Sequence, residues 1–455
     1  MYDVIVLGGG PAGYAAAIRT AQLGGNVLLA EAGKVGGTCL HRGCIPSKVL
    51  YHAASSYSKV IDYLSPDNAV APRLDRIAQR QRETVEKLYA GLCRVISSYG
   101  IITVNGHGEI ISPGLVRVGS AEYRAKKIII ATGSREAGFS IPGAKFARSA
   151  EESLKPPAKL CRVTVIGGGN TGLELASAYA LLGFKVTVIE KERRILPALA
   201  DEEIRNWLSF SLRKRGLIID TGVTPVEIRQ SGRALTVTSE NAAGTLTVDA
   251  DLVIAALGRR PNLDVLGEGL GELKNATEGY IQVNDSMETL MPDIFAAGDV
   301  TGPPMLAHLA YAEGIAAADN AMGIEHKLDR SAVPHFLSAH PGVAWAGMTE
   351  TQAAGAGLNC RTVKFPFAAN AHATILGQSE GMVKIVALEE TGTVVGMQIL
   401  GGRASEMIME GVLAIQNGLH VDRIAKTIHP HPTFSETIWE AALSFGEGAL
   451  HGLKQ

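Results

Sequence analysis

The sequence is poor in cysteine and in aromatic residues, and it has no excess of charge of either sign. Its 455 residues include five cysteines and only 5% aromatic residues. An odd and sparse set of cysteines does not describe a secreted scaffold held together by disulfides. The 43 basic and 45 acidic residues give a net charge of −2, so no basic surplus is available to neutralise phosphates. We therefore expect no nucleic-acid partner.

Two further patterns are missing, a targeting segment and a long hydrophobic run. Residues 1–6 do not show the basic stretch, apolar stretch and cleavage signal of a secretory leader. The apolar stretch 163–184 is interrupted by glycines 167–169 and by Glu174, which argues against a membrane span. We expect a soluble, cytoplasmic protein that does not enter a membrane.

Glycine and apolar residues are abundant instead. Glycine supplies 52 of 455 residues, about 11% against a usual ~7%, and hydrophobic residues make up 46%. This apolar content is enough for large cores, and the length predicts two to four domains. The composition favours an α/β protein in which many loops bring the backbone close to a ligand.

One unit of sequence occurs twice. In each copy an apolar strand (3–7 or 162–166) leads into a Gly-x-Gly-x-x-Gly run, a helix and a second strand that ends in glutamate. The glycines are Gly8, Gly10 and Gly13 in the first copy, and Gly167, Gly169 and Gly172 in the second. From the first glycine to Glu31 or Glu190 is 23 positions in both copies (31−8 and 190−167). Each copy also has a late apolar strand that ends in glycine, at 128–133 and 253–258.

This pattern is the fingerprint of dinucleotide binding. The three glycines permit the tight turn, the close approach of the backbone to a pyrophosphate and the packing of the helix on the strand. The pyrophosphate then sits at the helix N-terminus, and the acid accepts hydrogen bonds from ribose hydroxyls. A carboxylate at Glu190 would repel a 2′-phosphate, which favours NAD over NADP, although Lys191, Arg193 and Arg194 weaken this inference. We expect one bound flavin and one hydride-carrying nucleotide.

Two cysteines, Cys39 and Cys44, stand five positions apart with Gly43 between them and Pro46 after them. They can close a small loop at the head of a helix that we expect to begin near Ser47. A helix N-terminus lowers the pKa of a thiol, and the thiolate is the reactive species. A redox pair is favoured, because a structural disulfide does not suit a cytoplasmic protein and no second Cys or His pair has the spacing of a metal site.

The C-terminal region contains a histidine that could transfer protons. Residues 433–446 predict a helix, and His431 lies just before it. Histidine titrates near neutral pH and can therefore accept and return a proton at each thiol step. Glu436, five positions on, could orient the imidazole and stabilise its charge.

Together these motifs resemble those of the dihydrolipoamide dehydrogenases, which are flavin-dependent pyridine nucleotide–disulfide oxidoreductases. The resemblance covers essentially the whole chain. It rests on Gly-Gly-Thr-Cys-x4-Cys-Ile-Pro-Ser-Lys at 36–48, Ala-Thr-Gly-Ser at 131–134, Gly-Arg-Arg-Pro-Asn at 258–262, Asp-Ile-Phe-Ala-Ala-Gly-Asp at 293–299, Met-Leu-Ala-His at 305–308 and His-Pro-His-Pro-Thr-Phe-Ser-Glu at 429–436.

The resemblance implies an α/β fold with two Rossmann-like dinucleotide-binding domains plus a C-terminal α+β dimerisation domain. An FAD-binding domain would span 1–140 and 266–333, an NAD-binding domain 141–265, and the dimerisation domain 334–455. The active unit would be a homodimer in which His431 serves the flavin site of the other subunit.

The resemblance also assigns residues to each site, and it implies no metal. The catalytic residues would be Cys39, Cys44, Lys48, Glu174, His431 and Glu436. FAD would be bound by Gly8, Gly10, Gly13, Glu31, Gly37, Thr38, Lys48, Gly108, Thr132, Gly133, Ser134, Asp299, Met305, Leu306, Ala307 and His308. NAD would be bound by Gly167, Gly169, Gly172, Glu174, Glu190 and Gly258.

The implied reaction is the oxidation of dihydrolipoamide to lipoamide through a Cys39–Cys44 disulfide and FAD, with reduction of NAD+ to NADH. The lipoyl group would arrive on another protein or as free dihydrolipoamide. Mercuric and large thioredoxin reductases need a C-terminal cysteine pair, whereas the last cysteine here is Cys360. Glutathione reductases typically have lysine in place of Ser47, and soluble transhydrogenases lack the pair. A non-catalytic flavoprotein scaffold would need neither the cysteines nor His431.

Three segments depart from the usual pattern of these enzymes. Asn170-Thr171 replaces two residues that are commonly apolar or aromatic, one of which gates the nicotinamide pocket in relatives. Residues 338–342 replace a common Thr-x-Pro-Glu, and Leu309 stands where lysine is usual. These differences leave open a divergent paralogue that acts on another disulfide.

Overall fold

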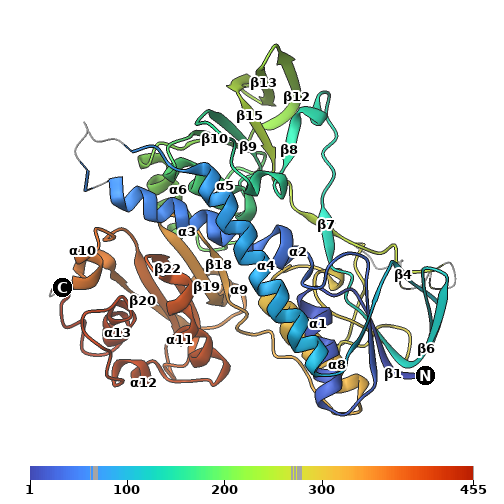
Figure 1. Ribbon diagram of the computed structural model, residues 1–455. Coiled ribbons are helices and arrows are strands. Elements are labelled where there is room, and N and C mark those ends of the chain that lie inside the picture. The colour runs from blue at the N-terminus through green and yellow to red at the C-terminus, as the bar shows by residue number, and fades with distance from the viewer. Residues whose placement is uncertain (62, 65–69, 268–269, 271–272, 274–278, 454–455) are drawn as a thin grey trace. The chain divides into compact units, whose positions relative to one another are not determined.

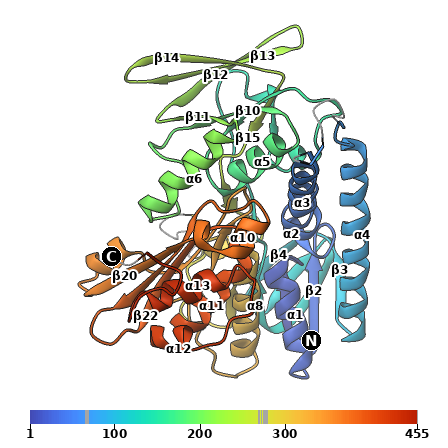
Figure 2. The ribbon, with the colours of Figure 1, turned by 90° about the vertical axis from the view of Figure 1, so that its left-hand side faces the viewer.

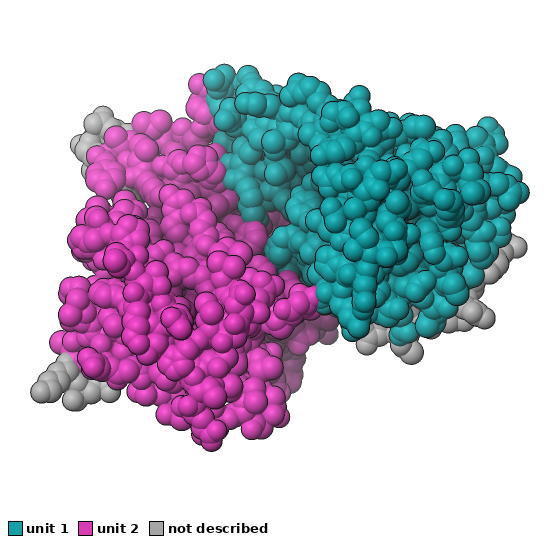
Figure 3. All heavy atoms as spheres, turned by 90° about the horizontal axis from the view of Figure 1, so that it is seen from below, with its two compact units in different colours: residues 1–49, 75–138, 258–328 teal, residues 50–74, 139–257, 329–455 magenta. Residues whose placement is uncertain are grey.

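The computed structural model describes residues 1–61, 63–64, 70–267, 270, 273 and 279–453 (Figures 1 and 2). The chain forms two compact units, which Figure 3 shows in different colours. The first unit comprises residues 1–49, 75–138 and 258–328, and the second comprises 50–74, 139–257 and 329–455. The three-domain division expected from the sequence stays a prediction. Residues 62, 65–69, 268–269, 271–272 and 274–278 of its first domain, and 454–455 of its third, lie outside the described residues.

The first unit is built on a sheet whose central strands are parallel. The strand order is β3-β2-β1-β6-β5-β4, and β17 pairs with β6. These strands are β1 (Tyr2–Leu7), β2 (Val27–Glu31), β3 (Ile102–Asn105), β4 (Gly108–Ser112), β5 (Leu115–Val118), β6 (Ala121–Ile130) and β17 (Ile294–Ala296). β1 pairs in parallel with both β2 and β6, and its residues Val4–Leu7 are buried. A continuous apolar strand of this kind is typical of a parallel sheet covered on both faces.

Helices α1 (Pro11–Gln22) and α8 (Ala307–Ala321) lie side by side in this unit (Figures 1 and 2). Gly314 of α8 makes the close approach possible, because a Cβ there would lie 2.2 Å from Ala12 O. Arg19 and Asp319 add an ion pair of 2.5 Å between the two helices. The unit also contains α2 (Gly37–Arg42), the first part of α3 (Cys44–Ile61), most of α4 (Leu74–Ser98) and the strand pair β7 (Ser134–Glu136) and β16 (Arg259–Pro261).

The second unit begins with another parallel sheet, of order β11-β10-β9-β15-β8. Its strands are β8 (Ala147–Ser149), β9 (Arg162–Ile166), β10 (Lys185–Glu190), β11 (Ile218–Thr221) and β15 (Leu252–Ala255), with helices α5 (Asn170–Leu181) and α6 (Glu202–Lys214). An antiparallel sheet of β12 (Thr224–Ser231), β13 (Ala234–Asn241) and β14 (Gly244–Ala250) accompanies it. The second fingerprint of the sequence thus begins a second parallel sheet.

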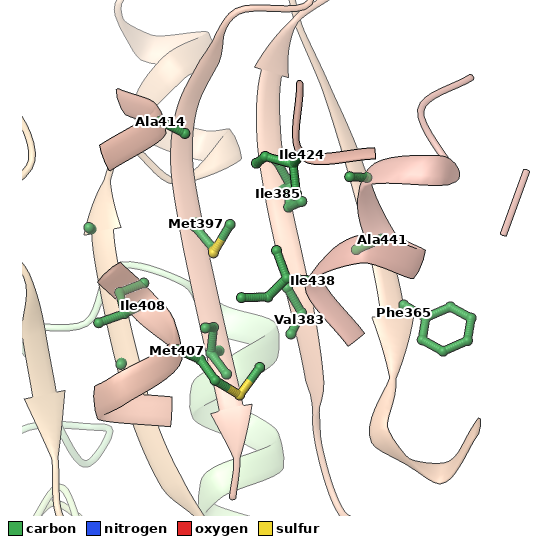
Figure 4. Close-up of a cluster of buried hydrophobic side chains, with 14 of the residues drawn as sticks. Phe365, Val383, Ile385, Met397, Met407, Ile408, Ala414, Ile424, Ile438 and Ala441 are labelled. Atoms are coloured by element: carbon green, nitrogen blue, oxygen red, sulfur yellow. The ribbon is translucent and has the colours of Figure 1, made fainter. Parts of the chain in front are cut away.

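The remainder of the second unit is an antiparallel sheet covered by helices (Figure 2). The strand order is β18-β19-β22-β21-β20, with β18 (His335–Leu337), β19 (Gly342–Gly347), β20 (Cys360–Pro366), β21 (Met382–Leu388) and β22 (Val394–Gly401). The helices are α9 (Glu350–Gly355), α10 (Ala371–Ile375), α11 (Ala404–Gln416), α12 (Val421–Ala425) and α13 (Glu436–Leu443). In Figure 4, Ile438 of α13 points toward Val383 and Ile385 of β21, within one buried cluster. The α/β class expected from the sequence is confirmed.

Ion pairs join the two parts of the second unit. Lys384 of β21 is buried and contacts Asp201 at 2.6 Å and Glu203 at 3.1 Å, next to the start of α6. Asp201 also caps α6, because its Oδ1 accepts a hydrogen bond from Ile204 N (2.8 Å). Among the described residues, no helix is both long enough and apolar enough to cross a lipid bilayer.

Candidate active site

The two fingerprints have the same geometry. Gly8 and Gly167 adopt φ values of +101° and +111°, and a Cβ at either would lie 2.3 Å from a carbonyl oxygen of the late strand. At Gly13 a Cβ would lie 1.7 Å from Gly8 O, and at Gly172 it would lie 1.8 Å from Gly167 O. The first and third glycines are therefore required by the fold itself.

Glycine occurs at the second position of each fingerprint, Gly10 and Gly169, for a different reason. Their φ values are −73° and −79°, which any residue can adopt, and a Cβ at either position would meet nothing within 4 Å. Neither conformation nor internal packing therefore demands glycine there. Both residues lie at the N-terminus of a helix, where unpaired N–H groups favour an anion. The open space fits a dinucleotide whose pyrophosphate approaches the backbone in each copy.

The acid of each copy is held beside its glycine loop. Glu31 accepts hydrogen bonds from Gly9 N (2.6 Å) and Gly33 N (2.7 Å). Glu190 accepts the corresponding bonds from Gly168 N (2.5 Å) and Glu192 N (2.8 Å). Each carboxylate oxygen keeps a further lone pair that a ribose hydroxyl can use. These backbone contacts were not foreseen from the sequence, which signals only the spacing of the acid.

The basic residues after Glu190 are largely matched by acids. Lys191 lies 3.8 Å from Glu192, and Arg194 lies 2.6 Å from Glu202. These ion pairs reduce the positive potential near Glu190. In the sequence alone, the basic residues were an argument for binding a 2′-phosphate.

The two cysteines of the 36–48 motif are in contact. Cys39 lies in α2, Cys44 is the first residue of α3, and their thiols form a hydrogen bond. The pKa of Cys39 is raised by this bond and then by burial, while nearby Lys48 acts in the opposite direction. The expected lowering of the thiol pKa is therefore wrong for Cys39 in the dithiol state. Lys48 lies one helical turn beyond Cys44 on α3, so the two residues share a helix face.

The expected start of α3 near Ser47 is also wrong, because the helix begins at Cys44. Ser47 N donates to Gly43 O at 3.0 Å, which closes the first turn around Pro46. Proline is tolerated there because an amide in the first turn has no intrahelical acceptor to lose.

The cysteine motif is anchored to the first fingerprint. Gly36 N donates to Gly9 O at 2.7 Å, and a Cβ at Gly37 would lie 2.7 Å from Gly10 Cα. Thr38 and Cys39 follow Gly37 directly in α2. The Cys39–Cys44 pair therefore lies beside the open space at Gly10, which we call the cradle of the first fingerprint (and the space at Gly169 the cradle of the second). The space at Gly10 and the sulfur pair thus belong to one site.

Two tyrosines border this site, and sequence reasoning missed them. Tyr14 donates its hydroxyl hydrogen to Tyr311 Oη at 2.8 Å. Burial raises the pKa of both tyrosines, and nearby Cys39 and Cys44 act in the same direction. Tyr14 directly follows the first fingerprint, but no local signal connects it with a residue 297 positions away.

The expected flavin loops come together in the first unit. Ser134 Oγ donates to Asp299 Oδ2, and Arg259 Nε donates to Ser134 Oγ at 2.7 Å. Thr132 Oγ1 donates to Asn262 O at 2.7 Å, and Asn262 Nδ2 donates to Thr132 O at 3.0 Å. The loop 132–134, which includes Gly133, is thereby tied to Asp299 and to the 259–262 segment.

Two further expected flavin segments lie close to α1 or to the end of β1. Gly298, next to Asp299, approaches Ala12, because a Cβ at Gly298 would lie 3.0 Å from Ala12 Cβ. A Cβ at Gly108 would lie 2.8 Å from Leu7 Cδ2 at the end of β1. In the 305–308 segment, Met305 precedes Leu306, which caps α8, and Ala307 and His308 begin that helix.

His431 and Glu436 form the expected pair in the second unit. His431 Nδ1 lies 2.8 Å from Glu436 Oε1, and Glu436 Oε2 accepts a hydrogen bond from Thr433 N at 2.7 Å. Burial acts to raise the pKa of Glu436, but the Thr433 and His431 hydrogen bonds outweigh it and hold that pKa below its usual value. The His431 side chain is 71% exposed, so its ring is accessible.

The helix after His431 begins at Glu436, so the expected boundaries of 433–446 are wrong. Thr437 N donates to Phe434 O at 3.0 Å in a turn before the helix, and the helix ends at Leu443. Glu436 is the first residue of the helix, and its side chain accepts the hydrogen bond from the backbone N–H of Thr433, which precedes the helix.

Two expected residues of the NAD site have contacts of their own. Glu174 Oε1 accepts a hydrogen bond from Ser338 N at 2.9 Å. Gly258 belongs to the first unit, where its carbonyl accepts a hydrogen bond from Ala137 N at 2.9 Å. The places of Glu174 and Gly258 at the nucleotide stay predictions.

Comparison with known proteins agrees with this geometry. Residues 2–314 match the family model described as pyridine nucleotide-disulphide oxidoreductase, and residues 333–442 match the dimerisation domain of the same family. The chain is 38% identical to a dihydrolipoyl dehydrogenase of Thermus scotoductus, over 100% of this chain and 99% of that protein. It is 37% identical to a dihydrolipoyl dehydrogenase of Bacillus subtilis, over 99% of each.

Solved structures give the same result. LpdA from Mycobacterium tuberculosis is similar with a TM-score of 0.88 and 26% identity, over 96% of this chain and 98% of that one. The HOCl-induced flavoprotein disulfide reductase RclA from Escherichia coli is similar with a TM-score of 0.86 and 27% identity, over 97% and 99%. The chain therefore belongs to the pyridine nucleotide-disulphide oxidoreductase family, as the resemblance of its motifs predicted.

Proposed function

We propose that this protein is a dihydrolipoyl dehydrogenase, which oxidises dihydrolipoamide to lipoamide and reduces NAD+ to NADH. The observation that carries the proposal is the contact between the Cys39 and Cys44 thiols beside the open cradle at Gly10. The curated relatives at 37–38% identity over nearly the whole chain bear this enzyme's name. Electron transfer from a dithiol to a pyridine nucleotide through a flavin requires two nucleotide-binding sites and one pair of cysteines.

In this proposal the first fingerprint binds FAD and the second binds NAD. The space at Gly10, the Glu31 carboxylate and the Ser134–Asp299 contact support an FAD site in the first unit. Bound FAD would supply the two-electron carrier between the cysteine pair and NAD+. The buried Glu190 carboxylate would bind the adenosine ribose and disfavour a 2′-phosphate.

The thiol chemistry would run on Cys39, Cys44 and His431. A substrate thiol gives its proton to His431 Nε2, since Nδ1 faces Glu436. The resulting thiolate attacks Cys39 Sγ of a Cys39–Cys44 disulfide, which forms a mixed disulfide and releases Cys44 as a thiolate. The second substrate thiol then attacks the substrate sulfur of the mixed disulfide, which closes the lipoyl disulfide and breaks the bond to Cys39. The proton of this second thiol passes to the departing Cys39 sulfur, which leaves as a thiol.

The organisation expected from the sequence completes the proposal. The three domains would be 1–140 with 266–333, 141–265 and 334–455, and the active unit a homodimer in which each His431 serves its partner's cysteine pair. The match to a dimerisation domain at 333–442 supports this arrangement. The enzyme would be cytoplasmic and would take its lipoyl group from another protein or as free dihydrolipoamide.

Cys44→Ser tests the proposal. The variant should keep bound FAD and lose dihydrolipoamide-dependent reduction of NAD+ by at least about a thousandfold, because the pair cannot form a disulfide. The matched control is Cys93→Ser, which removes a cysteine of helix α4 outside the motif and should leave turnover unchanged. Retained turnover in Cys44→Ser, or a wild-type protein that oxidises other thiols but not dihydrolipoamide, would refute the proposal.

A further inference from the structure

Asn370 stands immediately before helix α10, and it is buried, with 5% of its surface exposed. Both polar atoms of its side chain have partners. Oδ1 accepts a hydrogen bond from Ala373 N (2.9 Å), which caps α10. Nδ2 donates one hydrogen bond to Thr433 O (2.9 Å) and another to Thr437 Oγ1 (3.0 Å). One side chain therefore joins the start of α10 to residues 63 and 67 positions further along the chain.

The two ends of this amide meet different requirements. A helix cap needs only the acceptor, which serine or threonine can also supply. The bond to Thr433 O needs a donor, because a carbonyl oxygen only accepts, and the hydroxyl of serine or threonine lies one bond nearer the backbone than Nδ2. The partners also fix the direction of the amide, since Ala373 N only donates and Thr433 O only accepts. Capping of α10 alone therefore does not account for asparagine at this position.

The segment that Asn370 holds carries the His431–Glu436 pair. Thr433 N donates to Glu436 Oε2 at 2.7 Å, and Glu436 Oε1 lies 2.8 Å from His431 Nδ1. The backbone of Thr433 is thus held at its carbonyl oxygen by Asn370 and at its N–H by Glu436. Thr437, which directly follows Glu436 in α13, is held by the same nitrogen of Asn370. A continuous series of hydrogen bonds therefore leads from Asn370 to the imidazole ring.

Apolar packing of the same segment cannot replace these bonds. Phe434 is buried, and its ring meets Phe367 and His372 edge to face, with centroid distances of 5.6 and 5.1 Å. Burial of apolar surface has no preferred direction, so it holds the segment in place without fixing which way the neighbouring peptide group faces. The side chain of His431 is 71% exposed and gains little from packing. The direction of the imidazole therefore depends on the hydrogen bonds.

We propose that Asn370 is a positioning residue for the His431–Glu436 pair, and that it acts through the backbone to which this pair is bonded. The proposal rests on the proposed function, in which His431 Nε2 accepts the proton of a substrate thiol. A misplacement of about 1 Å in a reacting group can lower a rate about a hundredfold. Loss of the amide donor should therefore slow the thiol steps and leave the transfer of electrons between FAD and NAD unchanged.

Asn370→Ser and Asn370→Thr test this assignment, because both keep a helix cap and neither can reach Thr433 O as the amide does. Two rates are measured on each holoenzyme: reduction of bound FAD by dihydrolipoamide, and transfer of electrons from NADH to ferricyanide, which needs FAD but no thiol base. We expect the first rate to fall about ten- to a hundredfold in both variants, with the second rate and the FAD content within about twofold of the wild type.

Hydrogen–deuterium exchange provides a readout that does not depend on turnover. In both variants the backbone amides of Thr433 and Thr437 should exchange at least about tenfold faster than in the wild type, because the segment has lost its link to Asn370. The amides of α10 should keep their exchange rates, since the cap remains.

Thr374→Val is the matched control. It removes another hydrogen bond of α10, from Thr374 Oγ1 to Asn370 O (3.1 Å), and should leave both rates and the exchange of residues 429–437 unchanged. A full rate with dihydrolipoamide in both Asn370 variants, or an equal fall in Thr374→Val, would overturn the assignment. A parallel fall of both rates would show that Asn370 only supports the fold, and would overturn it too.

The two measurements also separate this assignment from the proposed function. A wild type that reduces ferricyanide but does not react with dihydrolipoamide would refute the proposed function. The exchange of residues 429–437 would still decide whether Asn370 holds the segment, and unchanged exchange in both variants would overturn the assignment.

Discussion

At the residue scale, the identity of the chemical groups was predictable and their contacts were not. The sequence motifs point to Cys39, Cys44, His431 and Glu436, and the structure brings each pair into contact. The raised pKa of Cys39 could not be predicted, because it arises from the partner thiol and from burial. Local sequence reports the residue types, whereas a pKa depends on neighbours that only the folded chain assembles.

The repeat allows nucleotide preference to be tested with an internal control. Glu190→Gln removes the negative charge that would repel a 2′-phosphate while keeping the side chain's shape. We expect the ratio of kcat/KM for NAD+ to that for NADP+ to fall at least about tenfold. Glu31→Gln, at the corresponding position of the first copy, should lower the FAD content without changing this ratio. An unchanged ratio in Glu190→Gln would contradict the role of its charge.

The buried side chain of His429, two residues before His431, predicts that the stability of the fold depends on pH. The pKa of His429 is raised because its Nε2 bonds to Glu410 at 3.1 Å, and burial only partly opposes this. The charged imidazole therefore stabilises the fold fully below the unfolded pKa of about 6.5, and this contribution is lost as the pH rises through the folded pKa. Glu410→Gln should lower the unfolding midpoint at pH 6 by about 2 °C and have a smaller effect at pH 9. A difference that grows with pH would have the wrong sign for this account.

At the element scale, the two βαβ units were predictable because their glycines, strand lengths and acids follow a fixed spacing. The exact boundaries of the helices were less predictable. α3 begins at Cys44 because Gly43 O accepts from Ser47 N, and α13 begins at Glu436 because residues 434–437 form a turn first. The hydrogen bonds that join α5 to residues 336–340 could not be predicted, because they connect positions more than 160 residues apart.

Substituting the second glycine of each fingerprint should weaken cofactor binding without destabilising the fold. At Gly10 and Gly169 an added Cβ meets no atom of the chain, so alanine should be tolerated by the fold. Gly169→Ala should keep its FAD and its melting temperature while raising the Kd for NAD+ at least about tenfold. Gly10→Ala should fold with less than about a tenth of the wild-type FAD content.

Gly172→Ala completes this set. Its Cβ would lie 1.8 Å from Gly167 O, so this variant should be markedly less stable as well as unable to bind NAD+. Calorimetry and FAD absorbance distinguish the three variants. Unchanged NAD+ affinity in Gly169→Ala would show that the open space is not the nucleotide cradle.

At the scale of the whole molecule, the α/β class and the two sheets with parallel strands at their centre followed from the sequence. The grouping of residues 139–257 with 329–455 did not, because it depends on contacts between segments far apart in the chain. Lys384 and Asp201, whose side chains are 5% and 4% exposed, form one of these contacts.

Removing one member of this buried pair should be costly. Lys384→Met leaves Asp201 buried without its cation, and we expect the free energy of unfolding to fall by about 3–5 kcal/mol in chemical denaturation. The double variant Lys384→Met/Asp201→Asn should recover much of this loss, since asparagine remains a good helix cap for α6. Equal stability of the single variant and the wild type would show that the pair does not hold the two parts of this unit together.

The most direct measurement of the central claim is the redox state of Cys39 and Cys44 during half of the proposed cycle. The oxidised holoenzyme is treated with dihydrolipoamide under anaerobic conditions without NAD+, its free thiols are alkylated, and the labelled peptides are identified by mass spectrometry. We predict that Cys39 and Cys44 become alkylated only after this treatment, and that adding NAD+ before alkylation returns them to the disulfide. Labelling of these two cysteines that is the same before and after dihydrolipoamide would contradict the account.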